Sequence, residues 1–330
     1  MKLLCSDGLR RATVAFFALL TCAAASSAEN AAWPTQSVRI IVGYPAGASP
    51  DTLARLVADP LSRVLGKPVV VENKPGAAGN LGVDAVVRST DGHTFGITTF
   101  GPLTTSKQLF KKLPYDPATD VLPLSLSATS PLVLVCDINL PPTSLKDFVA
   151  WAKGQPDGVT YGSIGLGTGS HLAMELFASK TGIRVLHVPY PGIPQVTTAI
   201  LGHQVQTAFM PPSGALAQAK AGKLRMLAVS SAQRWPLMPD LPTVAEAAGL
   251  ADFRGELWIG AFGPVTMPLE AAARLGTEIN AILKQPEVRE KLLQQGWEVV
   301  GGGSDVLRRR MADDTALWTR VIQEAKVPAE

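Results

Sequence analysis

The sequence predicts an α/β protein folded as two lobes, and three observations lead to this prediction. Strand-like and helix-like segments alternate along most of the chain, which is typical of mostly parallel sheets covered by helices on both faces. Two long extended segments, 124–135 and 255–262, interrupt the alternation. The chain is also long for a single domain. Two extended crossings between two α/β blocks can absorb a hinge rotation, so we expect a clamshell with two crossover hinge segments.

The first block of elements lies before the first crossing. β-Branched runs bounded by turn residues predict its strands, and apolar residues at helical spacing predict its helices. The expected order is a strand at 38–42, a helix at 52–64, a strand at 69–71, a helix at 82–88 and a strand at 95–99.

The middle and the C-terminal part repeat this scheme, and Thr143 or Ser144 is expected to cap the first middle helix. The middle elements are expected as a helix at 145–153, a strand at 159–163, a helix at 171–181, a strand at 185–188, a helix at 194–201, a strand at 205–209, a helix at 215–221 and a strand at 224–229. The C-terminal elements are expected as helices at 269–283, 286–295 and 306–324, with one strand near 298–300.

Residues 1–28 have the features of a secretory signal peptide. Basic residues precede an apolar run at 14–25, and small residues follow it. The run is shorter than the roughly 20 residues that a membrane span requires. We expect cleavage after Ala28 and a periplasmic location. Lipidation of Cys22 is the less favoured alternative, because Thr21 is a poor residue immediately before a lipidated cysteine.

Charge and cysteine usage narrow the class of protein. The predicted leader holds three basic residues and one acidic residue, so the net charge of +3 falls to +1 on cleavage. This balance argues against a nucleic-acid partner or an anionic membrane surface. Cys5 and Cys22 leave with the leader, so Cys136 cannot form an internal disulfide. Its apolar surroundings predict a buried strand residue.

The first candidate binding element is the loop at 43–51, which follows the first strand and opens the first helix. Ser49 is expected to be the N-cap, Pro50 suits the first helical position, and Asp51 places negative charge in the first turn. The small residues before them let backbone N–H groups face a cleft and hold an anion. A plain tight turn without a ligand stays open as the alternative.

The second candidate element is the glycine-rich loop at 161–171. It lacks the dinucleotide fingerprint, because Ser170 stands where the third glycine counted from Gly165 is needed, and it lacks the lysine of a phosphate loop. Accessible backbone N–H groups and the hydroxyls of Thr168 and Ser170 favour anion or carboxylate binding. A glycine-rich connection without a ligand is the alternative.

Patterns for catalysis and metal binding are missing from the sequence. A nucleophile elbow around Ser163 fails, because Tyr161 replaces the first glycine. Ser170 and His171 are adjacent at a helix start and do not face each other. The four histidines lack metal-ligand spacing. We therefore expect no catalytic residue, no metal and no cofactor, which argues against a secreted enzyme.

Several stretches along the whole mature chain match one family pattern. They are Trp33-Pro34, Tyr44-Pro45-Ala46-Gly47, the segments 70–80 and 113–117, His187-Val188-Pro189-Tyr190, and the segments 221–225 and 239–246. On these residues the chain resembles the Bug family of periplasmic receptors, the solute-binding components of tripartite tricarboxylate transporters.

The resemblance implies a two-lobed type II periplasmic binding protein (Venus flytrap) fold. Lobe 1 is then expected at 33–130 and 258–330, and lobe 2 at 131–257. A ligand carboxylate would lie in the cleft between them, held by the two loops. The implied site comprises Tyr44, Pro45, Ala46, Gly47, Ala48, Ser49, Asp51, Phe100 and Gly101 on one lobe, and Gly165, Leu166, Gly167, Thr168, Gly169, Ser170, His171, Pro189, Tyr190 and Met210 on the other.

The implied partners are a small carboxylate and a two-component membrane permease, with no nucleic acid and a monomeric chain. Asp51 could act as a helix cap rather than as a ligand contact. A sensing receptor for a signalling partner is one alternative role, and an orphan binding protein without a dedicated permease is another. The sequence does not separate these roles.

Departures from the family pattern bear on the ligand. Ala48 and Pro50 replace a usual glycine and a usual hydroxyl residue, while Gln206 and Met210 lie where many relatives carry aspartate. An ammonium group needs an acidic partner when buried, so we expect an aliphatic or aromatic mono- or dicarboxylate without an amino group. Leu166 is expected to favour a less polar ligand. Candidates for an apolar wall are Tyr44, Phe100, Leu166, Ile193 and Met210.

Overall fold

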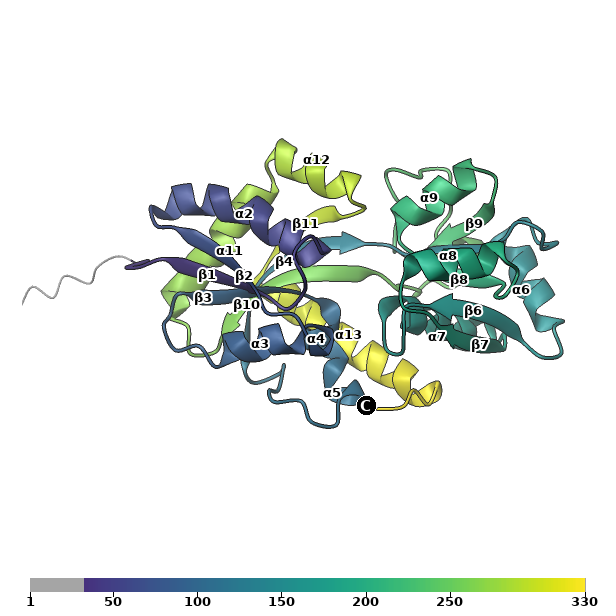
Figure 1. Ribbon diagram of the computed structural model, residues 1–330, viewed down its shortest axis with the longest axis horizontal. Helices are drawn as coiled ribbons and strands as arrows, with labels where there is room; N and C mark the ends of the chain where they lie inside the picture. The colour runs from purple at the N-terminus through teal and green to yellow at the C-terminus, as the bar shows by residue number, and fades with distance from the viewer. Residues whose placement is uncertain (1–32, 330) are drawn as a thin grey trace, which may run out of the picture.

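The computed structural model describes residues 33–329, which fold into two lobes that each surround one β-sheet (Figure 1). The α/β class and the two-lobed arrangement expected from the sequence are confirmed. The predicted signal peptide, its cleavage site and Cys22 lie outside the described residues.

The sheet of the first lobe has six strands in the order β11-β4-β10-β3-β1-β2. β1 pairs in parallel with both β2 and β3, whereas β10 runs antiparallel to β3 and β4, and β11 antiparallel to β4. The bounds are β1 Val38–Val42, β2 Val69–Asn73, β3 Thr94–Thr99, β4 Val121–Ser130, β10 Leu257–Pro264 and β11 Glu298–Gly303.

The sheet of the second lobe has five strands in the order β7-β6-β8-β5-β9. β6 pairs in parallel with β7 and β8, and β5 pairs antiparallel with β8 and β9. The bounds are β5 Val133–Asp137, β6 Val159–Ser163, β7 Val185–Pro189, β8 Thr207–Met210 and β9 Leu224–Val229. Cys136 lies fully buried on β5, as predicted.

Both sheets are mixed, so the expectation of mostly parallel sheets was wrong. The antiparallel pairs all involve β4, β10 or β5, the strands next to the passages between the lobes. A chain that leaves one sheet and later returns to it does not need the right-handed helical crossover that makes neighbouring strands parallel.

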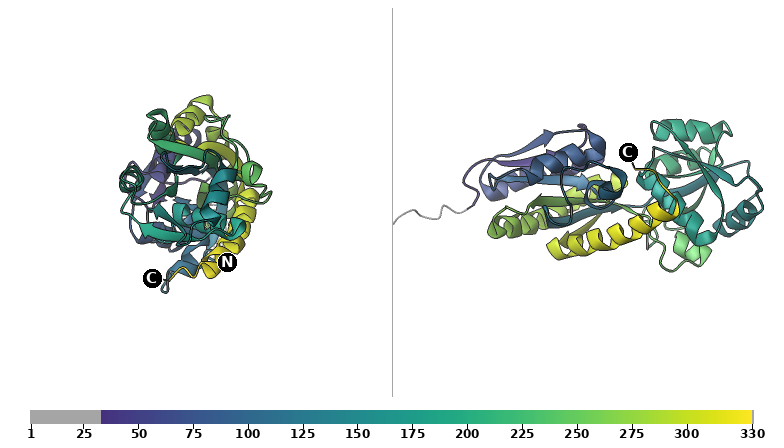
Figure 2. Two further views of the ribbon diagram at one scale, coloured as in Figure 1. Left: turned by 90° about the vertical axis from the view of Figure 1, so that its right-hand side faces the viewer. Right: turned by 90° about the horizontal axis from the view of Figure 1, so that it is seen from below.

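Helices cover both faces of each sheet (Figures 1 and 2). On the first lobe, apolar side chains of α2, such as Leu53 and Val57, are buried in one core with Ile40 of β1 and Leu275 of α11. The helices of this lobe are α2 Ser49–Leu65, α3 Asn80–Val87, α4 Phe100–Thr104, α5 Ser106–Leu109, α11 Leu269–Leu283, α12 Pro286–Gln294 and α13 Ser304–Glu324, with a short 3₁₀ turn η1 at Ala77–Gly79.

The second lobe buries Phe177 of α7 against Phe209 of β8 and Phe253 in one core. Ser144 is the N-cap of α6 and accepts a hydrogen bond from the Asp147 N–H, so the predicted cap is confirmed. The helices are α6 Leu145–Lys153, α7 Gly169–Thr181, α8 Ile193–Leu201, α9 Pro212–Lys220 and α10 Val244–Ala248.

The chain passes between the lobes at two places. β4 of the first sheet leads directly into β5 of the second, and β10 leads back into the first sheet, where it pairs with β4. The two predicted extended segments therefore match observed strands. The lobe limits at 130/131 and 257/258 agree with these crossings and stay a prediction.

Helix α13 runs from the first lobe across the junction (Figure 2). It packs against β4 and α4 and also against α7 of the second lobe. Its buried Asp314 accepts hydrogen bonds from the Trp258 indole N–H (2.6 Å), from Arg310 (2.8 Å) and from Arg254 (3.2 Å). Because Arg254 and Trp258 belong to the second crossing, this charged cluster ties α13 to the hinge.

Candidate functional site

A cleft of about 620 Å³ lies between the lobes, and the two candidate loops form opposite parts of its wall. The predicted site residues that line it are Tyr44, Ala48, Ser49, Phe100, Gly101, Gly165, Leu166, Gly167, Thr168 and Gly169. The structure therefore brings together segments that are more than 100 residues apart in the sequence.

Other predicted residues lie near the cleft without lining it. Pro45, Ala46 and Gly47 are exposed at the outer side of the first loop, and Pro189 is exposed at the end of β7. Asp51, Ser170 and His171 are buried behind the two loops, and the Tyr190 ring is close to Gly162. The wall candidate Ile193 does not line the cleft either.

Met210 was wrongly placed as part of the apolar wall. It is fully buried in a core cluster with Val133 and Ile200. The predicted strand 205–209 is observed at Thr207–Met210 and pairs on both sides, so its side chains are enclosed by α8 and α9 rather than directed to the cleft.

The cleft has further lining residues that sequence reasoning missed, and they come from several parts of the chain. Ile164 lies within the second loop, and Ala77 and Ala78 lie within the family-like segment 70–80, so local signals existed for them. Leu109 ends α5 and Phe110 follows it, whereas Trp297 and Pro328 belong to the C-terminal part. The complete set of missed lining residues is Pro50, Ala77, Ala78, Pro102, Thr105, Ser106, Leu109, Phe110, Ile164, Leu257, Trp297 and Pro328.

Asp51 fixes the first loop from behind. Its carboxylate accepts hydrogen bonds from the Gly47 N–H (2.8 Å), from Asn73 (2.8 Å) and from Arg55 (3.0 Å). Burial acts to raise its pKa, but these hydrogen bonds outweigh that effect and hold the pKa below its ordinary value. Asp51 thus serves as a structural anchor of the loop.

The N-cap position of α2 differs from the prediction. Ala48 occupies it without a side-chain cap, and Ser49 is the first helical residue. Because Asp51 already binds the Gly47 N–H, the loop does not need a capping hydroxyl. Among the described residues, the Ser49 and Asp51 N–H groups have no hydrogen-bond acceptor, so the positive end of α2 borders the cleft.

Tyr44 joins the first loop to the turn after β3. Its hydroxyl donates to the Ala78 carbonyl (3.0 Å) and lies 2.6 Å from the Thr99 hydroxyl. Burial raises the pKa of Tyr44, so the phenol stays neutral. The three residues form one fixed polar wall of the cleft.

The second loop uses several of its own backbone donors. The Gly165 N–H donates to Ser163 Oγ (3.1 Å), and the Gly167 N–H donates to His171 Nδ1 (3.1 Å). Thr168 occupies the N-cap position of α7. The N–H groups of residues 169–171 have no acceptor among residues 33–329, so the positive end of α7 also faces the cleft.

A buried cluster supports this loop from below. The His171 and His187 rings lie 4.3 Å apart between centroids, and the Tyr161 hydroxyl is 2.6 Å from Glu175. Burial, with the neighbouring His187, lowers the pKa of His171 to about 4, and burial raises the pKa of Glu175. His171 is therefore neutral near pH 7, with Nδ1 free to accept. His187 Nε2 lies 2.6 Å from Ser163 Oγ and fixes the start of the loop.

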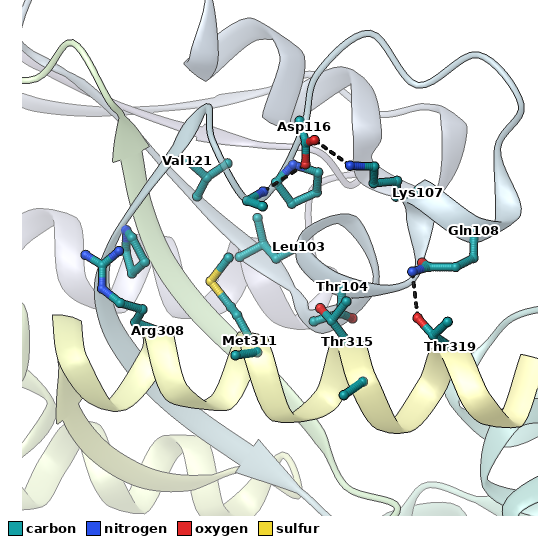
Figure 3. Close-up of a pocket in the computed structure, with 15 residues that line it drawn as sticks. Leu103, Thr104, Lys107, Gln108, Asp116, Val121, Arg308, Met311, Thr315 and Thr319 are labelled. Atoms are coloured by element: carbon teal, nitrogen blue, oxygen red, sulfur yellow. Dashed lines mark hydrogen bonds and ion pairs between the residues drawn. The ribbon is translucent and has the colours of Figure 1, made fainter.

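A second cavity of about 520 Å³ lies between α4, α5, the segment 116–123 at the start of β4, and α13 (Figure 3). Leu103, Val121 and Met311 form its apolar floor, and Lys107 at its rim is paired with Asp116. Neither candidate loop reaches it. The interlobe cleft is therefore the better candidate site.

Comparison with known proteins agrees with this geometry. The family of tripartite tricarboxylate transporter receptors matches residues 53–327. The chain belongs to this family. BugT of Bordetella pertussis is 33% identical over 311 residues, which cover 94% of each chain.

Two solved structures are similar to this receptor along nearly its whole length. Rpa4515 of R. palustris with adipate has a TM-score of 0.74 and 33% identity, covering 90% of this chain and 100% of that one. MatC from Rhodopseudomonas palustris with bound malate has a TM-score of 0.70 and 28% identity, covering 88% of this chain and 100% of that one. The family and the similar structures are solute-binding proteins. In residues 33–329 of this receptor, no helix has the length and apolar character needed to cross a membrane.

Proposed function

We propose that this protein is a periplasmic receptor that captures a small carboxylate without an amino group and delivers it to a two-component membrane permease. The export signal predicted at 1–28 supports the location, and the receptor family supports the partner. The adipate and malate bound by the two similar structures support a carboxylate ligand.

One observation carries the proposal. The N-terminal ends of α2 and α7, one from each lobe, border the same cleft with N–H groups that have no acceptor among the described residues. Such ends favour an anion through aligned backbone dipoles. Hydrogen bonds to a charged group contribute roughly 1.5–3 kcal/mol each, so four or five donors are sufficient for micromolar binding after the costs of association.

The lining chemistry also disfavours an amino acid. Among residues 33–329, none of the residues that line the cleft carries a carboxylate. Three acidic residues adjoin lining residues in the sequence: Asp51 is buried and bound by the first loop itself, Glu256 pairs with Arg310, and Glu298 follows Trp297. A ligand ammonium would therefore be buried without an acidic partner, which is costly. The lack of a carboxylate in the described lining, rather than the presence of Met210, is therefore the reason to expect a ligand without an amino group.

The same geometry explains how binding could be signalled to a permease. A carboxylate that contacts donors from both lobes gains more in a closed arrangement than in an open one. Only such differential affinity shifts the population of the two states. The permease would then recognise the closed, ligand-bound receptor and not the open, empty receptor.

A thermal-shift screen of the mature chain tests the proposal. We expect a higher unfolding midpoint with at least one carboxylate, because a ligand that binds only the folded state stabilises it by mass action. The methyl ester and the amide of the same compound should give no shift, and neither should its α-amino derivative. Equal shifts with acid and ester would contradict carboxylate recognition.

A further inference from the structure

In the part of the chain that the structure describes, the interlobe cleft has no formally charged side chain in its lining. Its residues are apolar or carry neutral hydroxyls, and none is Asp, Glu, Lys, Arg or His. Three of the charged residues that adjoin lining residues in the sequence are engaged elsewhere: Asp51 anchors the first loop, Lys107 pairs with Asp116, and Glu256 pairs with Arg310. The described lining thus offers a ligand anion backbone N–H groups and neutral side chains, and no cation.

The backbone donors that lack an acceptor among the described residues lie at the ends of α2 and α7, which border the same cleft and can converge on one carboxylate. A second carboxylate on the same ligand would lie against the remaining lining, which is mostly apolar, with the hydroxyls of Thr105 and Ser106 as its polar groups. The apolar residues include Leu109, Phe110, Leu166, Leu257 and Trp297. A charge removed from water without a hydrogen-bonding partner is strongly disfavoured.

Two large apolar side chains on the second loop are exposed toward this space. Ile164 and Leu166 retain 41% and 42% of their accessible surface, although both line the cleft. Adjacent exposed apolar side chains in a concave site are typical of a surface that a ligand covers.

Two glycines of the second loop, Gly167 and Gly169, lie in close contact with leucine side chains from outside the loop. A Cβ at Gly167 would lie 2.3 Å from Leu109 Cδ1, and a Cβ at Gly169 would lie 2.2 Å from Leu257 Cδ2. Leu109 comes from the first lobe and Leu257 from the second crossing. The second loop is therefore packed directly against leucines, and these leucines continue the apolar lining next to the donors of α7.

We propose that the ligand is a monocarboxylate with an apolar body, an aromatic ring or an alkyl chain, and that Leu166 and Leu109 select this body. The inference rests on the proposed function and narrows its ligand class. It also separates this receptor from the relative that was solved with the dicarboxylate adipate.

Calorimetric titration of the mature chain at neutral pH with matched acids tests the inference. Hexanoate and adipate have the same carbon chain and differ by one carboxylate. We expect hexanoate to bind at least about tenfold more tightly. In the series acetate, butanoate and hexanoate, each methylene should strengthen binding about three- to fourfold. An aromatic acid, 3-phenylpropanoate, tests the ring alternative.

Two variants connect the preference to the cleft. Leu166→Asn should weaken hexanoate binding about five- to tenfold and leave acetate binding nearly unchanged. Leu237→Asn is the matched control, because Leu237 is similarly exposed, at 47%, and does not line the cleft. It should leave every affinity unchanged. Thermal unfolding of both variants shows whether they are folded.

The outcomes separate this inference from the proposed function. Adipate or malate binding as tightly as the monocarboxylates would overturn the inference and leave carboxylate capture intact. An unchanged chain-length series in Leu166→Asn would overturn the selecting role of Leu166. No binding of any of these acids would overturn both proposals.

Discussion

Individual buried side chains fix the shapes of both binding loops. In the second loop, the Gly167 N–H donates to His171 Nδ1, so that nitrogen must carry no proton. His187 lies against the same ring, and Tyr161 and Glu175 are the other titratable groups around it. Protonation of His171 would place two donors opposite each other and would add charge to a buried site.

The first residue-scale prediction is a loss of stability in acid. The pKa of His171 is about 4 in the folded protein, against an ordinary value of 6.5. Between pH 6.5 and pH 4, the unfolded chain therefore binds more protons at this histidine than the folded protein does. The free energy of unfolding should fall by up to about 3 kcal/mol as the pH drops through this range. His187, whose pKa is also lowered, acts in the same direction.

Urea unfolding of the wild type and of His171→Asn at pH 7 and pH 4.5 measures this effect. Asn retains an acceptor for the Gly167 N–H but does not titrate, so its loss of stability in acid should be smaller. The raised pKa of Glu175 favours the folded protein in acid and therefore acts in the opposite direction. Because Glu175 is present in both proteins, the comparison between them cancels its contribution. Equal losses in the two proteins would rule out His171 as the titrating group.

The second residue-scale prediction concerns Asp51. Asp51→Ala leaves the Gly47 N–H and the Asn73 amide without their acceptor, and should lower the free energy of unfolding by about 2–3 kcal/mol. Asp84→Ala is the control, because Asp84 also pairs with an arginine four residues later, on an exposed helix face. It should cost less than about 1 kcal/mol. Similar losses for both variants would contradict the anchoring role.

At the scale of elements, the close contact between α5 and the second loop restricts which residues the loop can carry. Gly167 and Gly182 both have φ of 69°, so a side chain at either position strains the backbone. They differ in their surroundings, because Leu109 occupies the space beside Gly167, whereas no atom lies within 4 Å of the Cβ position at Gly182.

Gly167→Ala should therefore lower ligand affinity about tenfold or more, since the loop or Leu109 must move. Gly182→Ala should lower stability by about 1 kcal/mol through the backbone alone and leave affinity unchanged. Titration with the acid that binds best measures both affinities. If Leu109→Ala restores binding to Gly167→Ala, the contact between α5 and the loop is the cause.

At the scale of the whole molecule, α13 and the second crossing are joined through Asp314. Removal of this carboxylate would leave the buried Arg310 and the Trp258 indole N–H without their shared acceptor. Asp314→Ala should lower the free energy of unfolding by about 3–5 kcal/mol, as is typical of a broken buried ion pair. The neighbouring Asp313 is exposed, and Asp313→Ala should change stability by less than about 0.5 kcal/mol. Urea unfolding distinguishes these two outcomes.

The sequence by itself determined the class of fold, most element positions and the two loops. Strands such as 38–42 and helices such as 145–153 match the structure because hydrophobic periodicity and capping are local properties. The loops were recognisable because small residues between a strand and a helix form a local pattern. Helices α4, α5 and α10 were missed, since helices of four or five residues form only through tertiary contacts.

Only the tertiary structure decided which residues share the cleft. Met210 and Leu109 are both apolar and both lie near element ends, yet Met210 is enclosed by its own lobe and Leu109 reaches the loop of the other lobe. The mixed strand directions and the junction of α13 with the hinge also depend on contacts between distant segments. Local periodicity carries no information about such contacts, because burial and orientation are set by the packing of the two lobes as a whole.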